Sequence, residues 1–153
     1  MRTLLTACLL LASLPAQNAK LVVTGKTSAL SSGSLCDAWS CVPGPLDLMR
    51  GEGMRLSLSG GPFSPFSLLV SVQPAACTGI PGIDGSLIVQ FPLIEVPLAV
   101  TWGRFYGTCQ GWIGFADVAL PILPAGSSFV LQGLFANTGY GPALTDAARV
   151  TIR

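Results

Sequence analysis

Apolar and polar residues alternate along much of the chain, which is the pattern of β-strands that bury one face. In residues 54–60, Met54, Leu56 and Leu58 alternate with arginine and serine. Successive side chains of a strand point to opposite faces of a sheet, so this segment predicts one buried and one solvated face. Similar patterns predict strands over residues 20–25, 66–73, 86–91, 97–102, 115–121 and 148–153, and a central strand, apolar on both faces, over 127–137.

Turn residues separate these strands. Gly and Pro cluster at residues 59–65, 79–85, 123–128 and 137–142, and such clusters favour tight turns. Short strands at this spacing, without a helical pattern, predict an all-β fold. We expect a single domain over residues 20–153, an antiparallel β-sandwich of about seven to nine strands, similar in kind to immunoglobulin and fibronectin III domains.

The composition excludes several classes of chemistry. The 153 residues are 50% hydrophobic and only 10% charged, with a formal net charge of +1, so no basic patch for nucleic acid is expected. The chain has no histidine, which excludes Ser-His-Asp and Cys-His catalysis and any zinc site that needs imidazole. No nucleotide-binding motif occurs. We therefore expect no enzyme activity, no cofactor and no metal.

The first residues predict export. Residues 1–19 contain Arg2, an apolar run over 4–14 and small residues beyond it, which is the layout of a secretory signal peptide. Cleavage after Ala16 or Ala19 fits the pattern equally well. Cys8 lies in a lipoprotein-like sequence, so lipidation is an alternative, but we interpret it as part of the apolar run. We expect an extracellular, periplasmic or cell-surface location without a transmembrane segment.

Removal of this segment leaves four cysteines, at positions 36, 41, 77 and 109. An even number in an exported chain predicts two disulfides. The spacing of Cys36 and Cys41 is too wide for a C-x-x-C redox motif and marginal for zinc. If successive strands alternate in direction, Cys77 and Cys109 lie at one end of the domain, which predicts the pairs Cys36–Cys41 and Cys77–Cys109.

The segment 102–112 is rich in aromatic residues and is the candidate binding site. Exposed rings of this kind can stack on sugars or fill a protein interface, with polar neighbours supplying hydrogen bonds. The alternative is that the two tryptophans only close the end of the core beside Cys109. The candidate residues are Trp102, Arg104, Phe105, Tyr106, Gln110 and Trp112.

The C-terminal part, from about Gly111 to Arg153, has a paired-proline strand end, a Gly-x-x-Phe-x-x-Gln strand start and a closing Ala-x-Arg-Val-Thr strand. These motifs resemble the C-terminal or repeated β-sandwich domains of large exported proteins of environmental bacteria. The resemblance implies an exported, non-catalytic β-sandwich and no known ligand. It places the motif residues mostly in the core: Phe129, Leu131, Gln132, Arg149 and Val150.

Together these features favour a secreted, non-catalytic structural or interaction module of the cell envelope or extracellular space. Its partner would be another protein or a second copy of the chain. The alternative is a small carbohydrate-binding module that uses the aromatic segment 102–112. Exposed, coplanar rings would favour the sugar, whereas an exposed aliphatic edge strand would favour assembly.

Overall fold

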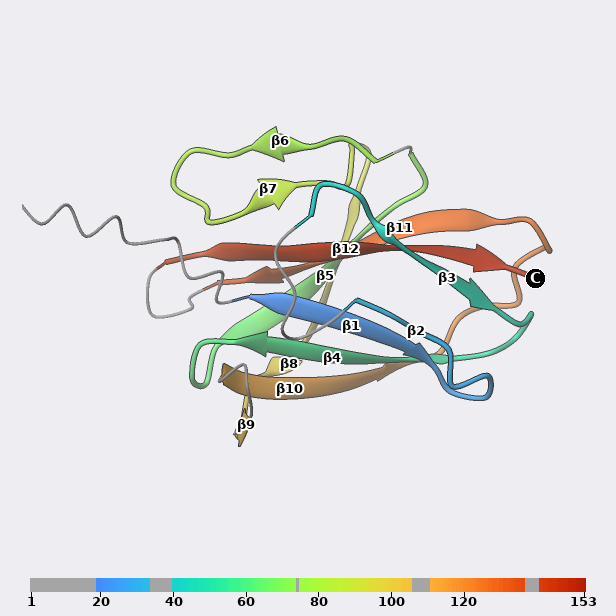
Figure 1. Cartoon of the computed structure of the whole chain (residues 1–153), viewed down its shortest axis with the longest axis horizontal. Helices are drawn as coiled ribbons and strands as arrows, with labels where there is room; N and C mark the ends of the chain where they lie inside the picture. The colour runs from blue at the N-terminus through green and yellow to red at the C-terminus, as the bar shows by residue number, and fades with distance from the viewer. Residues whose placement is uncertain (1–18, 34–39, 74, 106–110, 137–140) are drawn as a thin grey trace, which may run out of the picture.

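The computed structural model describes residues 19–33, 40–73, 75–105, 111–136 and 141–153. Within these residues the chain forms strands and turns and contains no helix. Two five-stranded sheets stack face to face, and a two-stranded hairpin lies outside one of them (Figure 1). The structure therefore confirms the all-β, sandwich-like fold that the alternation of apolar and polar residues predicts.

Sheet A contains the strands nearest the N-terminus, and all its neighbouring strands are antiparallel. The bounds of β1 and β4 agree with the strands predicted over 20–25 and 54–60. In spatial order its strands are β2 (Ser31–Ser32), β1 (Lys20–Gly25), β4 (Met54–Gly60), β10 (Gly111–Val118) and β9 (Gly103–Phe105).

Sheet B lies on the other side of the core and ends at β8, which pairs with β5 along one edge. The parallel pair in this sheet joins β3 to β12. In spatial order its strands are β3 (Gly44–Leu48), β12 (Ala143–Ile152), β11 (Ser128–Phe135), β5 (Pro65–Ser71) and β8 (Ile94–Val100).

The main core fills the space between the two sheets. Met54, Leu56 and Leu58 of β4 lie on its sheet A side and are buried, whereas the intervening residues face outward. From sheet B, Leu131 and Phe135 are fully buried. Burial of aliphatic and aromatic side chains on this scale is the main stabilising contribution to the fold.

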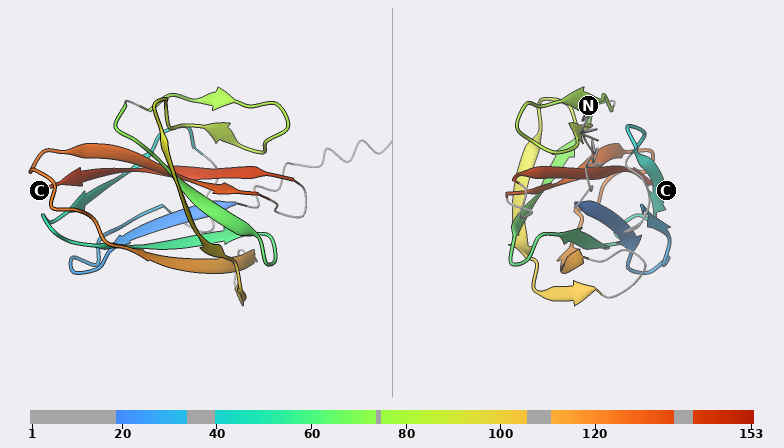
Figure 2. Two further views of the ribbon diagram at one scale, coloured as in Figure 1. Left: turned by 180° about the vertical axis from the view of Figure 1, so that it is seen from behind. Right: turned by 60° about the vertical axis from the view of Figure 1, so that its left-hand side comes forward.

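A second, smaller core lies on the opposite face of sheet B. The chain between β5 and β8 folds into a hairpin of β6 (Thr78–Gly79) and β7 (Ser86–Leu87), which covers part of this face (Figure 2). The residues buried there are Leu69, Ile88, Val89, Val130, Leu144 and Ala147. The domain therefore has three layers over this part of sheet B.

Glu52 connects two turns beside sheet A. Its Oε1 accepts hydrogen bonds from the backbone N–H groups of Thr27 and Ser28, and its Oε2 accepts one from Met49 at 2.9 Å. Burial alone raises the pKa of Glu52, but these hydrogen bonds outweigh it and lower the pKa from 4.5 to about 2. The buried carboxylate is therefore charged at neutral pH.

The strand predicted over 86–91 is wrong beyond Leu87. In a strand over 86–91, Val89 and Phe91 would share the buried face and Ile88 would face outward. Instead, Ile88 and Val89 are both buried, and Phe91 is 76% exposed. These residues cover a sheet instead of extending one, so alternation by two does not describe them. The strand predicted over 97–102 is β8, which begins at Ile94 and ends at Val100.

The predicted disulfide pairing is also wrong, because the structure joins Cys41 to Cys77, with a Cα–Cα distance of 5.5 Å. The prediction assumed that every strand returns in the opposite direction. Instead, the chain after β5 folds back over sheet B, which brings Cys77 to the segment that precedes β3. Cys36 and Cys109 lie outside the described residues.

Candidate interaction surfaces

The edge strand β8 carries an exposed apolar surface. Ile94 and Val96 are the register partners of Val70 and Leu68, so they lie on the face of sheet B that points into the sandwich. Leu68 is buried, yet Ile94 is 67% exposed and Val96 is 38% exposed. Sheet A therefore leaves the inner face of β8 largely uncovered at Ile94 and Val96, whereas Leu98 packs against the main core. We name Ile94 and Val96 the β8 strip. Val100 is also exposed, but it lies on the other face of the sheet, because its register partner Pro65 precedes the inward-facing Phe66.

Two residues of β8 limit how this edge can be used. Pro97 lies within the strand and Glu95 is exposed. Proline has no N–H to donate, so at the open side of an edge strand it prevents a regular hydrogen-bond ladder with an added strand. An exposed charge at the edge also disfavours such pairing. The geometry therefore favours contact through the side chains of the β8 strip rather than extension of the sheet.

Thr101 fixes the corner between β8 and β9. Its side chain is fully buried, and its Oγ1 donates to the carbonyl of Gly61 at 2.6 Å and accepts the Ser64 N–H at 2.9 Å. Thr101 thereby joins this corner to the β4–β5 turn. The next residue, Trp102, is 66% exposed, and its ring meets the edge of Phe115 at a centroid distance of 6.4 Å.

Trp112 belongs to a second aromatic pair. It is half-buried at the start of β10, and its ring lies 5.0 Å from that of Phe63 in a tilted arrangement. Phe63 is exposed, and its φ of 48° lies in the left-handed region, which residues other than glycine seldom adopt. The turn therefore places this ring on Trp112.

The structure places the rings of Trp102 and Trp112 in two different aromatic pairs. The alternative that both tryptophans close the end of the core is wrong for Trp102, which is exposed. Its ring pairs with Phe115, whereas the half-buried Trp112 pairs with Phe63. The two pairs do not form one coplanar platform. The backbone of Arg104 and Phe105 lies in β9, their side chains are not among those described, and Tyr106 and Gln110 lie outside the described residues.

A charged groove crosses the outer face of sheet A. Arg55 donates two hydrogen bonds to Asp117, at 2.9 and 3.3 Å, and Lys26 lies 3.0 Å from the same carboxylate. The hydrogen bond from Arg55, and then that from Lys26, lower the pKa of Asp117 to about 2. The groove has a volume of about 480 Å³, and its described lining includes Arg55, Phe115 and Asp117.

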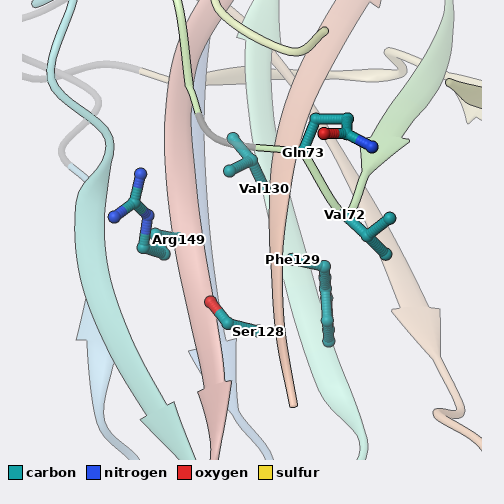
Figure 3. A pocket seen from close by; sticks show the side chains of 6 residues that line it. All are labelled: Val72, Gln73, Ser128, Phe129, Val130 and Arg149. Carbon is teal, nitrogen blue, oxygen red and sulfur yellow. The ribbon is translucent and has the colours of Figure 1, made fainter. Parts of the chain in front are cut away.

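A smaller pocket of about 190 Å³ lies on sheet B at the rim of the area that the hairpin covers (Figure 3). Val130 of β11 lies between its register partners Arg149 of β12 and Ser71 of β5. Arg149 is the exposed member of the motif residues, as its alternation with the buried Val150 predicts. This rim pocket is lined by Val72, Gln73, Ser128, Phe129, Val130 and Arg149.

Sequence reasoning missed the β8 strip and the two aromatic partners, Phe63 and Phe115. The apolar residues of β8 have the spacing of a half-buried strand, and only the tertiary arrangement shows that sheet A leaves them uncovered. Phe63 lies in a turn marked by Gly and Pro, where side-chain contacts cannot be derived from periodicity. Phe115 is a single exposed ring in β10, and its pairing with Trp102 could not be predicted from the sequence.

No group of three or more His, Cys, Asp or Glu side chains within the described ranges could hold a metal ion. In the same ranges no helix is long and apolar enough to cross a membrane. Neither a protein-family model nor a curated protein matches this chain. Its function is therefore argued from the surfaces described above.

Proposed function

We propose that the chain is an exported, non-catalytic module that binds a protein partner in the cell envelope or extracellular space through the β8 strip. The observation that carries the proposal is the exposure of Ile94 and Val96 on the inner face of sheet B. Contiguous exposed apolar surface on a soluble domain is typical of an interaction site. The low charge of the chain, with 15 charged residues in 153, agrees with this use.

Four further observations support the location and the fold. A disulfide such as Cys41–Cys77 is most stable in an oxidising compartment, and the first 19 residues have the layout of an export signal. The two stacked sheets, with β3 parallel to β12, agree with a fold of the immunoglobulin or fibronectin III kind. The even number of cysteines beyond residue 19 agrees with a second disulfide.

Carbohydrate binding is the second candidate function, and the exposed ring of Trp102 favours it. Together with Phe115, this ring lies beside the groove that contains Arg55 and Asp117. Such a site could stack a sugar ring and bind its hydroxyl groups. It would be on the outer face of sheet A, and Trp112 would not belong to it, because that ring packs against Phe63.

A peptide-library selection tests the first proposal. The oxidised chain without residues 1–19 is immobilised and exposed to phage that display random twelve-residue peptides. We expect enrichment of peptides rich in aliphatic residues, and loss of their binding by Ile94→Ser. The matched control is Ile122→Ser, because Ile122 is 72% exposed but lies between β10 and β11.

Other results would contradict the proposal. Equal effects of Ile94→Ser and Ile122→Ser would show that binding does not depend on the β8 strip. A concentration-dependent dimer in sedimentation velocity that Ile94→Ser dissolves would make a second copy the partner. A shift of tryptophan emission with one soluble polysaccharide, without any enriched peptide, would favour the carbohydrate function instead.

A further inference from the structure

The charged groove on sheet A adjoins a second pocket. β1, β4 and β10 are neighbours in this sheet (Figure 1), and Arg55 of β4 is the register partner of Thr24 on one side and of Asp117 on the other. The second pocket lies beside β1, has a volume of about 360 Å³ and is lined by Thr24, Lys26, Ala29 and, again, Arg55. Because Arg55 lines both, the groove and the pocket form adjacent subsites that follow a line across the strands.

The side chains of both subsites lie on one face of the sheet. Leu56 is buried in the main core, so the preceding Arg55 points outward. Thr24 and Asp117 face the same way because they are the register partners of Arg55. Phe115 shares this face because it lies two residues from Asp117 on β10. One ligand can therefore contact all of them without passing around an edge of the sheet.

Arg55 and Asp117 present donors and acceptors side by side. Their side chains remain 59% and 45% exposed although they are joined by two hydrogen bonds. A guanidinium group has five N–H donors and a carboxylate has about four acceptor positions, so both keep capacity for a ligand. A sugar hydroxyl both donates and accepts, and neighbouring hydroxyls therefore match this pair. An anionic ligand would be repelled by Asp117, and a cationic one by Arg55 and Lys26.

Phe115 provides an apolar surface next to the charged pair. Its ring is 45% exposed, and the ring of Trp102, 66% exposed, meets it at an interplanar angle of 63°. The electron-rich face of an aromatic ring attracts the C–H groups of a sugar. The Cα atoms of Phe115 and Asp117 are about 7 Å apart along the strand, so one sugar ring can contact both side chains.

We propose that the outer face of sheet A binds a neutral glycan chain of at least two sugars. One sugar stacks on Phe115 and bonds through its hydroxyls to Asp117 and Arg55, and the next occupies the subsite beside β1. This inference rests on carbohydrate binding, the second candidate function, and names its ligand and its subsites. It does not depend on the β8 strip, which lies on sheet B.

Neutral oligosaccharides test this inference. The oxidised chain without residues 1–19 is screened on an array of β-glucan, xylan and mannan fragments of one to six sugars, and the Kd of a bound fragment is measured by calorimetry. We expect binding that needs two or more sugars. Phe115→Ala and Asp117→Asn should each raise the Kd by about tenfold or more, because the first removes the stacking surface and the second removes a charged acceptor.

Phe63→Ala and Asp47→Asn are the matched controls. Phe63 is also an exposed ring, packed on Trp112. Asp47 also belongs to an exposed ion pair, with Arg153, and its side chain is 46% exposed, close to the 45% of Asp117. Neither control variant should change the Kd of the glycan.

Several results would overturn the inference. A glycan whose Kd is unchanged by Phe115→Ala and Asp117→Asn would leave carbohydrate binding in place but would not bind at this face. Tighter binding of polygalacturonate that needs Arg55 and is lost in high salt would make the groove an anion site. If no glycan binds, carbohydrate binding fails as well, whereas peptide binding that depends on Ile94 would leave the first proposal intact.

Ile94→Ser separates this surface from the β8 strip. It should remove peptide binding and leave the Kd of the glycan unchanged, because Ile94 lies on sheet B. Loss of glycan binding in Ile94→Ser would contradict a separate site on sheet A. Enriched peptides that need Phe115 would assign the outer face of sheet A to a protein instead.

Discussion

The side-chain oxygen of Gln132 accepts the backbone N–H of Ile88 at 2.8 Å, 44 residues away in the sequence. The amide nitrogen of the same side chain donates to the carbonyls of Ser86 and Thr145, each at 2.8 Å. Gln132 is fully buried. One side chain of β11 therefore satisfies the backbone of β7 and of the residue after it, and holds the hairpin on sheet B.

Gln132→Met should detach this hairpin. Methionine has a similar length but cannot replace the hydrogen bonds, and each buried polar group left without a partner costs about 1–3 kcal/mol. We expect the free energy of unfolding to fall by about 3 kcal/mol in urea titrations, and the amide of Ile88 to exchange with deuterium much faster. Gln73→Met, at an exposed position, should change stability by less than about 0.5 kcal/mol. Unchanged exchange at Ile88 would contradict the role of Gln132.

The hydrophobic pattern predicted most of the fold because the main core follows a simple rule. In β4, every second residue is buried, and the strand predicted over 54–60 has the bounds of the observed one. The pattern failed where a third layer is added. In the strand predicted over 66–73, Leu69 alternates with the core-facing Leu68 and Val70, yet it is also buried, under the hairpin. The adjacent Ile88 and Val89 are likewise both buried. Periodicity reports which faces are apolar, and it does not report which segment covers them.

The candidate site was predictable only in part for the same reason. The aromatic residues of segment 102–112 were visible in the sequence, and Trp102 is exposed as a binding residue must be. The surface of β8 was not visible, because Ile94 and Val96 have the spacing of core residues. Their exposure depends on where sheet A ends, which is a property of the packing of the two sheets.

Cys41 and Cys77 should be recovered as one cross-linked peptide pair after proteolysis under non-reducing conditions. The two residues are 36 apart in sequence, and the chain-entropy model gives up to about 4 kcal/mol for a loop of that length. We therefore expect Cys41→Ser combined with Cys77→Ser to lower the free energy of unfolding by up to about 4 kcal/mol. A peptide that links Cys41 to Cys36 would contradict the structure.

Gly114→Ala should destabilise the domain although it adds a single methyl group. A Cβ at this position would lie 2.6 Å from the ring of Phe66, which is buried and packs against Phe135 at a centroid distance of 5.6 Å. A ring enclosed in the core in this way must shift to admit the methyl group, and overpacking of this kind costs about 1–3 kcal/mol. Gly79→Ala is the matched control because a Cβ there would meet nothing within 4 Å. Equal melting temperatures of the two variants would show that the core at Gly114 is looser than described.

Glu52 should make the stability of the domain depend on acid. Its folded pKa of about 2 lies below the ordinary value of 4.5, so the unfolded chain takes up a proton first as the pH falls. The contribution of Glu52 is therefore complete above about pH 5 and is lost between about pH 4.5 and pH 2.

Glu52→Gln isolates this effect. The variant removes the charge and some of the hydrogen bonds to Thr27, Ser28 and Met49, so we expect a loss of about 3 kcal/mol at pH 7. Urea titrations from pH 7 to pH 2 should show the two proteins converging, because the native carboxyl becomes protonated as well. Glu95→Gln removes an exposed charge and should match the unchanged protein at pH 7. Parallel pH profiles for Glu52→Gln and the unchanged protein would mean that Glu52 does not carry the acid sensitivity.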